Sequence, residues 1–404
     1  MATENTFLRL SNLTLVLALA SGCGARTGLG RGEPADGPST TDAGADAAVE
    51  VGAGPPRLPH VTRLRAGAFQ TCAVLDEGSL KCWGENLTDQ SGVAHFPDGP
   101  KVLLVPNPIA LSGVTDVSIG QGHVCALHGK DELSCWGLND KGQLGVSPSL
   151  NHTPTPVSVA GTYRQVIAGL QNTCALGSDG KVRCFGANEK GEAGLGTVGA
   201  PDFHPRAVML GEVTELGGGG LSWGHCAVRI DGGVSCWGAG HGAAWGSVDP
   251  MPYSVPGLSS VAHVAAADFH ACAEVADGGV WCWGANADGQ LAQGAASFDW
   301  TYPPVKAKGV PSFTTLACAG YQCCVIDALA DVWCWGIRSS PVPVPSPVKV
   351  AGIGGRAVQV ALGNGHACVL RDDDVVVCWG GNQLGQLGDG TMTDHDTPKP
   401  VVGL

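Results

Sequence analysis

Charged side chains are scarce in this 404-residue chain, and basic ones are in the minority. Only 15% of residues are charged, and 36 acidic residues against 23 basic ones give a formal net charge of −13. A surface of that sign repels nucleic-acid phosphates and anionic lipid headgroups. We therefore expect no nucleic-acid partner.

Motifs that bring catalysis or a cofactor are also lacking. The sequence has no phosphate-cradling loop with lysine, no His-Glu-x-x-His helix and no regularly spaced acidic calcium loop. We predict that the protein is not an enzyme and has no catalytic residue, no metal and no cofactor. Gly and Pro are abundant, at 62 and 26 residues, but the 44% apolar content is enough to fill a core.

No apolar run is long enough to cross a membrane. The run Leu10–Ala20 rises about 1.5 Å per residue and reaches about half of a roughly 30 Å bilayer core, which is typical of a signal peptide. It leads through small residues to Cys23, a pattern that resembles the lipobox of bacterial lipoproteins, although Ala20 stands where that pattern prefers Leu. The resemblance implies a signal peptide over 1–22 and lipidation of Cys23, with plain secretion as the alternative.

The stretch that follows is poor in large apolar side chains. Residues 24–56 consist mainly of Gly, Ala, Asp, Pro, Ser and Thr, which bury too little surface to offset the entropy cost of ordering. We interpret residues 23–57 as a flexible tether and 58–404 as the folded domain.

The chain has 17 cysteines, most of which form pairs ten residues apart that recur about every 49 residues. The pairs are Cys72 with Cys82, Cys125 with Cys135, Cys174 with Cys184, Cys226 with Cys236, Cys272 with Cys282, Cys324 with Cys334 and Cys368 with Cys378. The repeats fill residues 58–404, which indicates a closed or stacked array.

Each unit carries the signals of a β-hairpin. In the third unit, two short β-prone runs flank Asp179-Gly180, and pairing about that turn places Cys174 opposite Cys184. Opposed residues in an antiparallel pair are close enough for a disulfide, so we predict one in each hairpin. A structural zinc site is disfavoured because no pair has the usual Cys-x2–4-Cys spacing.

Two further cysteines are candidates for an eighth bridge. Cys318 and Cys323 lie across a short Gly-containing segment. Because Cys323 and Cys324 are adjacent, the sequence leaves open which of them pairs with Cys334.

Each hairpin ends in Trp-Gly or, at Phe185-Gly186, a near equivalent, and four units continue with a pattern such as Asn139-Asp-Lys-Gly-Gln-Leu-Gly145. Several units have a glycine and a histidine shortly before the first cysteine, in the pattern Gly-x-His or a close variant of that pattern such as Gly365-His366. This pattern resembles the regulator of chromosome condensation repeat. The resemblance implies an all-β, seven-bladed propeller of four-stranded antiparallel blades.

The ends of the chain suggest how the ring closes. The first unit lacks a preceding Pro-x-Pro-Val strand, and Pro398–Val402 supplies one at the C-terminus, so we expect the terminal strands to pair. Unit one has the insertion Glu85–Pro108 in place of Gly-Gln-Leu-Gly, and unit six is shortened after Ile337.

Residues that break the repeat are the candidates for function, since the fold does not require them. The repeated His123, His270 and His366, with His225 displaced by one place, are expected to be structural. The linkers of units four and five are rich in aromatics, which are enriched at binding hot spots. The candidate binding residues are Trp245, Tyr253, Phe298, Trp300 and Tyr302, with ordinary packing as the alternative and His95-Phe96 as a second candidate.

We therefore expect an exported, lipid-anchored lipoprotein of the bacterial cell envelope, in the outer membrane or at the cell surface. It would act as a monomeric interaction module for an unidentified envelope or extracellular protein, touching the membrane only through its anchor. Glycan binding is the alternative. Guanine-nucleotide exchange, which the family resemblance also implies, is less favoured because an exported chain does not meet a nuclear GTPase.

Overall fold

The computed structural model describes residues 60–95, 97–149, 151–240, 246–337 and 342–404. Cys23, the predicted signal peptide and the predicted tether lie outside these residues. Among the residues described, no helix has the length and apolarity that crossing a membrane requires.

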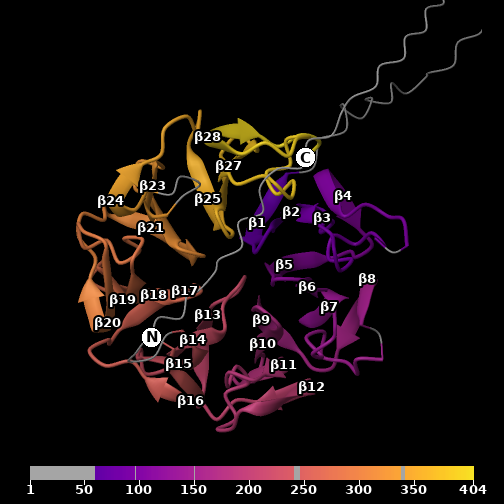
Figure 1. The fold of residues 1–404 in the computed structure, drawn as a ribbon, viewed down its shortest axis with the longest axis horizontal. Coiled ribbons are helices and arrows are strands. Elements are labelled where there is room, and N and C mark those ends of the chain that lie inside the picture. The colour runs from indigo at the N-terminus through magenta and orange to yellow at the C-terminus, as the bar shows by residue number, and fades with distance from the viewer. Residues whose placement is uncertain (1–59, 96, 150, 241–245, 338–341) are drawn as a thin grey trace, which may run out of the picture. The chain divides into compact units, whose positions relative to one another are not determined.

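Four-stranded antiparallel sheets are arranged as seven blades around a ring, as the sequence predicts (Figure 1). Each blade is one continuous segment with its strands in chain order from the centre outward. Blades 1 to 3 contain β1 Val61–Gly67, β2 Gln70–Leu75, β3 Leu80–Glu85 and β4 Val102–Ile109; β5 Val114–Ile119, β6 His123–His128, β7 Glu132–Leu138 and β8 His152–Val159; β9 Tyr163–Ala168, β10 Asn172–Gly177, β11 Val182–Asn188 and β12 Gly199–Ala207. Blades 4 and 5 contain β13 Val213–Gly217, β14 Gly224–Arg229, β15 Val234–Ala239 and β16 Val248–Ser254; β17 Val261–Ala266, β18 His270–Val275, β19 Val280–Asn286 and β20 Ser297–Lys306. Blades 6 and 7 contain β21 Phe313–Ala319, β22 Gln322–Asp327, β23 Val332–Gly336 and β24 Val344–Lys349; β25 Ala357–Leu362, β26 His366–Arg371, β27 Val376–Gly380 and β28 His395–Pro400.

The hairpin register is the same in every blade and places the paired cysteines opposite each other on the second and third strands. All seven predicted hairpin disulfides are confirmed. They join Cys72 to Cys82, Cys125 to Cys135, Cys174 to Cys184, Cys226 to Cys236, Cys272 to Cys282, Cys324 to Cys334 and Cys368 to Cys378.

The eighth predicted bridge is also present, between Cys318 and Cys323. The register resolves the ambiguity in blade 6, because Cys324 faces Cys334 on β23 whereas Cys323 faces Cys318 on β21. Blade 6 therefore has two disulfides, one across each pair of its three inner strands.

The glycine of each Trp-Gly pair is required by close backbone packing. Gly336 has φ +92°, and a Cβ added there would clash with the carbonyl oxygen of Tyr321. A side chain at this position would therefore push apart the two central strands of the blade.

In blades 1, 2, 3, 5 and 7, the loop between the third and fourth strands ties the blade to the next one. In blade 5, Asn286 Oδ1 accepts from the backbone N–H of Leu291 at 3.1 Å, and the Gln290 carbonyl accepts from Trp335 Nε1 of blade 6 at 2.9 Å. Leu291 is fully buried and belongs to the same apolar cluster as Trp335. The Trp-Gly and Asn-x-x-Gly-Gln-Leu-Gly motifs are thus two halves of one interblade contact.

Blade 1 retains this contact, which corrects the expectation that its insertion replaces the motif. Asn86 Oδ1 accepts from the backbone N–H of Ser91 at 2.9 Å, and the Gln90 carbonyl accepts from Trp136 Nε1 at 2.9 Å. The loop keeps its geometry because Asp89 takes the left-handed conformation, φ 67°, that glycine takes in the loops of blades 2, 3, 5 and 7.

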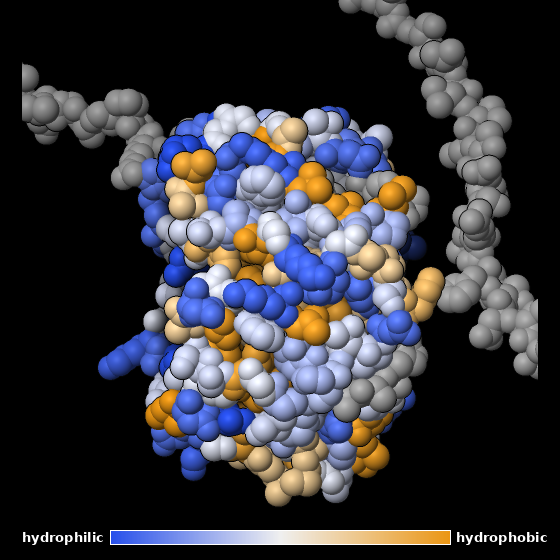
Figure 2. Space-filling model, turned by 90° about the vertical axis from the view of Figure 1, so that its left-hand side faces the viewer, coloured by the Kyte–Doolittle hydropathy of each residue, from blue (hydrophilic) through white to orange (hydrophobic). Residues whose placement is uncertain are grey.

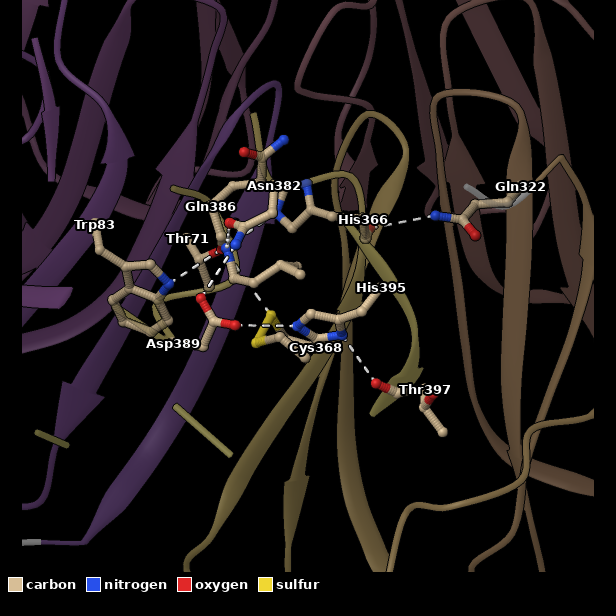
Figure 3. The surroundings of a disulfide bond; sticks show 12 residues. Thr71, Trp83, Gln322, His366, Cys368, Asn382, Gln386, Asp389, His395 and Thr397 are labelled. Carbon is tan, nitrogen blue, oxygen red and sulfur yellow. Dashed lines mark hydrogen bonds and ion pairs between the residues drawn. A yellow bond between two sulfur atoms is a disulfide. The ribbon is translucent and has the colours of Figure 1, made fainter. Parts of the chain in front are cut away.

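The expectation that the terminal strands pair is wrong. β28 pairs with β27, β1 pairs with β2, and each remains inside the four-stranded sheet of its own blade. Contacts of side chains and backbone close the ring instead: Trp83 Nε1 donates to the Gln386 carbonyl at 3.1 Å, Asn364 N donates to the Ala68 carbonyl at 2.9 Å, and Thr71 and His366 are hydrogen-bonded across the same seam (Figure 3). Blade 7 needs no strand from the N-terminal end of the domain. Its fourth strand, β28, follows its other three strands in the same stretch of chain.

Candidate functional site

The turns between first and second strands and the loops between third and fourth strands lie on one face of the propeller, because successive strands alternate in direction. We call this the turn face. Its inner rim is formed by the first-to-second-strand turns, at residues 68–69, 120–122, 169–171, 218–223, 267–269, 320–321 and 363–365.

Three consecutive blades carry an aromatic side chain at the end of this turn. Trp223, Phe269 and Tyr321 directly precede the second strands of blades 4, 5 and 6, and we call them the aromatic arc. The rings of Phe269 and Tyr321 are stacked, with centroids 6.5 Å apart and planes 24° apart. Trp223 and Phe269 are partly exposed and Tyr321 is 37% exposed.

Carboxyl groups accompany the arc. Asp268 is 5% exposed, and burial raises the pKa of its carboxyl to about 7. Burial also raises the pKa of the Tyr321 hydroxyl, with smaller contributions from Asp268 and Asp288. The arc therefore combines stacked rings with a carboxyl group that is poised between its neutral and charged forms at neutral pH.

The aromatics predicted from the sequence divide into two groups. Tyr253 on β16 and Tyr302 on β20 are partly buried against the apolar cluster between blades 4 and 5, as the packing alternative expects. Phe298 is 98% exposed near the turn-face end of β20, and Trp300 is partly exposed. Contrary to the prediction of linkers, these residues lie in outermost strands, while Trp245 and Phe96 lie outside the described residues.

Apolar side chains are dispersed over the one outer side of the propeller that Figure 2 shows. Figure 2 shows the side that carries β20 and β24, where small hydrophobic groups are separated by hydrophilic ones. The rim therefore offers no large continuous apolar surface among the described residues in this view.

The repeated histidines are buried and bond to the next blade. His123 Nε2 lies 2.8 Å from Thr173 Oγ1, and His366 Nε2 lies 3.1 Å from Thr71 Oγ1. Burial lowers the pKa of His123 to about 3 and that of His366 to about 4, so both imidazoles are neutral at pH 7. These contacts agree with the predicted structural role.

The innermost strands line a central channel with a cavity of about 330 Å³. Asp116 and Glu215, which line it, are paired with Arg65 and His263. These ion pairs within the lining neutralise the charged groups that face the cavity from neighbouring blades.

A glycine-rich segment, Gly217–Gly220, reaches from blade 4 toward other blades near this channel. Gly220 N donates to the carbonyls of Ile119 and Ala168 at 3.2 and 3.0 Å. Gly218, Gly219 and Gly220 all have positive φ, so glycine is required for this crossing.

The same turn matches a catalytic motif, so the expectation that the sequence lacks such motifs, including a Gly-x-Ser-x-Gly elbow, is wrong at this position. Residues 220–224 read Gly-Leu-Ser-Trp-Gly, the pattern of a hydrolase nucleophile elbow. Ser222 is fully buried, and its Oγ donates to the carbonyl of Gly224 at 2.6 Å. The segment joins two antiparallel strands rather than a strand and a helix, so it is a turn that Ser222 stabilises.

Sequence reasoning also missed the aromatic arc, because its members differ in type and lie outside the aromatic-rich linkers. The signal is visible once the repeats are aligned on the cysteines. Each arc residue stands three places before the first cysteine of its hairpin. Blade 1 also has an aromatic residue, Phe69, at the same position. Phe69 does not continue the arc, because blade 7 lies between blades 6 and 1 and has Gly365 at this position.

Comparisons with known proteins agree with this architecture. Residues 114–143, 163–192, 261–290, 357–386 and 277–326 match the Regulator of chromosome condensation (RCC1) repeat. The Ultraviolet-B receptor UVR8 of Arabidopsis thaliana is 26% identical over 89% of this chain and 85% of its own length. Protein pim1 of Schizosaccharomyces pombe is 30% identical over 22% of this chain, a match that spans only 17% of pim1.

Solved structures show the same fold. The human WBSCR16 structure has a TM-score of 0.70 at 20% identity and covers 81% of this chain and 94% of its own. The Prp20p structure from Saccharomyces cerevisiae has a TM-score of 0.69 at 18% identity, covering 85% and 88%. The chain therefore contains regulator of chromosome condensation repeats and folds as a seven-bladed propeller.

Proposed function

We propose that this protein is an exported protein-binding module whose partner docks on the turn face at blades 4 to 6. The aromatic arc carries the proposal. The fold does not need a ring at these turn positions, since the residues that precede the second strands of blades 2, 3 and 7 are Gly122, Gln171 and Gly365. Partly exposed aromatic rings give large contact area at low entropic cost and are enriched at hot spots.

The carboxyl groups beside the arc indicate the chemistry of the partner. A nearby cation would favour the ionised form of Asp268, whose pKa lies at about 7, and guanidinium groups stack on aromatic rings. The net charge of −13 adds long-range attraction for basic surfaces. The partner would therefore present an arginine or lysine among apolar side chains.

The comparisons support a protein partner through fold alone. The structure report on Prp20p names binding properties to Gsp1p and histones, which are proteins. We do not carry those partners over, because the identity is 18% and the predicted export of this chain argues against guanine-nucleotide exchange.

We further propose that the chain is delivered to the cell envelope and anchored through Cys23. The signal-peptide pattern and the eight disulfides support an oxidising compartment. Mass analysis of the mature N-terminal peptide tests the anchor: a diacylglyceryl mass on Cys23 is expected, and an unmodified N-terminus or an intact leader would contradict it.

The docking proposal is tested with the full-length protein immobilised on beads. Proteins captured from envelope extract are identified, purified and titrated against wild type and a double variant, Phe269→Ser with Tyr321→Ser. We expect the variant to bind its partner at least tenfold more weakly. The matched control is Phe203→Ser with Met251→Ser, because those exposed residues lie on the outer strands of blades 3 and 4. Equal affinity for all three proteins would refute the proposed face.

Glycan binding is the second candidate, and the stacked Phe269 and Tyr321 rings favour it because sugar rings also pack on aromatic faces. Retardation of wild type on an immobilised polysaccharide, lost in the double variant of these two residues, would assign the arc to glycans.

A further inference from the structure

The loop after β3 contains a buried carboxylate that the repeat pattern does not require. The corresponding loop position is glycine at positive φ in four other blades, at Gly142, Gly191, Gly289 and Gly385. In blade 1 it is Asp89, which adopts φ 67° and has a side chain only 3% exposed. A left-handed non-glycine residue with a buried charge is costly, so a compensating interaction is expected.

Two imidazoles from different blades converge on this carboxylate. Asp89 Oδ1 lies 2.7 Å from His95 Nδ1, in the blade 1 loop, and Oδ2 lies 2.6 Å from His152 Nδ1, at the start of β8 in blade 2. The two imidazole rings have centroids 5.4 Å apart. The Asp89 carboxylate also accepts the backbone N–H of His95 at 2.7 Å, which fixes the loop around it.

We propose that Asp89, His95 and His152 form a binding site for a late first-row divalent cation, for which Zn²⁺ is the probe. Two imidazole nitrogens and one carboxylate are a donor set suited to Zn²⁺, with a fourth position left for water or a partner's side chain. This site departs from the sequence-based expectation of no metal.

The geometry is compatible with an ion. The candidate donor atoms of the three residues all lie within 4.8 Å of one another. Donors of a tetrahedral zinc ion, each about 2.0–2.2 Å from the metal, stand about 3.3 Å apart, so small side-chain shifts suffice. His152 is 37% exposed, which gives an ion access from solvent.

Metal binding would replace the two imidazole–carboxylate hydrogen bonds with coordination bonds, in which the ionised carboxylate and the neutral imidazole nitrogens are the donors.

Blade 7 supplies a matched control within the chain. Asp389 and His395 also form a carboxylate–imidazole pair, with Oδ2 and Nε2 3.2 Å apart (Figure 3). There the carboxylate is completed by Asn382 and Thr391 rather than by a second histidine. This pair has too few donors for a zinc site and should not respond to the ion.

Isothermal titration of Zn²⁺ into chelator-treated, tag-free full-length protein tests the proposal. We expect one site in wild type, at least tenfold weaker binding in His152→Asn and in His95→Asn, and unchanged binding in His395→Asn. Because His152 is partly exposed, its variant should keep the fold, which circular dichroism checks.

Substitution of Co²⁺ gives a second readout, since coordination by these side chains produces visible absorption bands that a hydrogen-bonded triad lacks. Wild type that binds neither ion would overturn the proposal. Binding that persists unchanged in the double variant, His95→Asn with His152→Asn, would equally overturn it, because the ion would then sit elsewhere.

Discussion

At the scale of single residues, the first residue of each second strand is of a type that suits the side chain facing it from the next blade. His123 and His366 face Thr173 and Thr71, and Asn172 Nδ2 lies 2.6 Å from His225 Nε2. In blade 1 the residue at this position is Gln70, and its neighbour in blade 2 is the apolar Val124. The Gln70 side chain therefore donates to Ser91 Oγ of its own blade. A buried polar side chain thus occurs at this position where a hydrogen-bond partner is within reach.

The buried histidines should make stability depend on pH. The pKa of His366 is about 4 in the folded protein and near 6.5 when unfolded, so the unfolded chain takes up the proton first. Stability is then full above pH 6.5 and falls on acidification toward pH 4, by about 1.4 kcal/mol per unit for each such histidine. His366→Gln, the residue type used at Gln70 and Gln322, should reduce that slope by the same amount.

Urea unfolding at pH 6, 5 and 4 with disulfides intact measures the slope. Parallel pH profiles for wild type and His366→Gln would contradict the role given to this histidine.

Asp268 has the opposite pH dependence. Its pKa of about 7 exceeds the usual 3.8, so the folded protein holds the proton more tightly than the unfolded chain. The stability it contributes is full below pH 3.8 and is lost as the pH rises through 7. Asp268→Asn should therefore be more stable than wild type at pH 8, by on the order of 4 kcal/mol, with no difference near pH 4. Thermal midpoints at both pH values check this, and a variant less stable than wild type at pH 8 would refute it.

At the scale of elements, the loop between third and fourth strands acts as a clamp on the next blade. Asn286 closes the loop twice, through Oδ1 to the Leu291 N–H and through Nδ2 to the Ala295 carbonyl at 3.0 Å. The loop then presents Leu291 and the Gln290 carbonyl to blade 6.

Asn286→Ala should loosen this clamp. Loss of two partly buried hydrogen bonds is expected to cost about 2–3 kcal/mol of unfolding free energy. Hydrogen exchange should accelerate over 286–296 and in β23, while Gln293→Ala, whose amide is more exposed, should affect the loop less. Unchanged exchange in β23 would show that the loop does not brace blade 6.

The elements also show what the sequence determines and what it leaves open. Hairpins and disulfides are predictable because a short turn, which is Asp-Gly in blades 3 to 5, sets the register and the cysteines then face each other. The pairing of Cys323 and Cys324 is not, since adjacent residues point to opposite sides and only the position of β21 decides. The Asp89 cluster is likewise hidden, because His152 lies 63 residues away in another blade.

At the scale of the whole molecule, the seam between blades 7 and 1 closes the ring without shared strands. Val401 and Leu404 pack against the cluster that contains Leu64 and Trp83. Lys81 Nζ donates to the Gly403 carbonyl at 3.0 Å. The last residues thus lie between the first and last blades, which explains why the sequence suggested closure by the C-terminus but not its form.

Removal of residues 401–404 should weaken this seam specifically. We expect a lower thermal midpoint and faster hydrogen exchange in β1 and β25, with blade 4 unaffected at temperatures below the transition. Uniform acceleration over all blades would indicate that the ring unfolds as one unit and that the seam has no local stability of its own.

Docking of a partner on the turn face at blades 4 to 6 is the central functional claim for the whole molecule. The most direct measurement is hydrogen exchange of the full-length protein with and without the purified partner obtained by capture. We predict protection of the turns at 218–223, 267–269 and 320–321. Protection confined to the opposite face, at the hairpin turns near Asp231, Asp277 and Leu329, would contradict the claim.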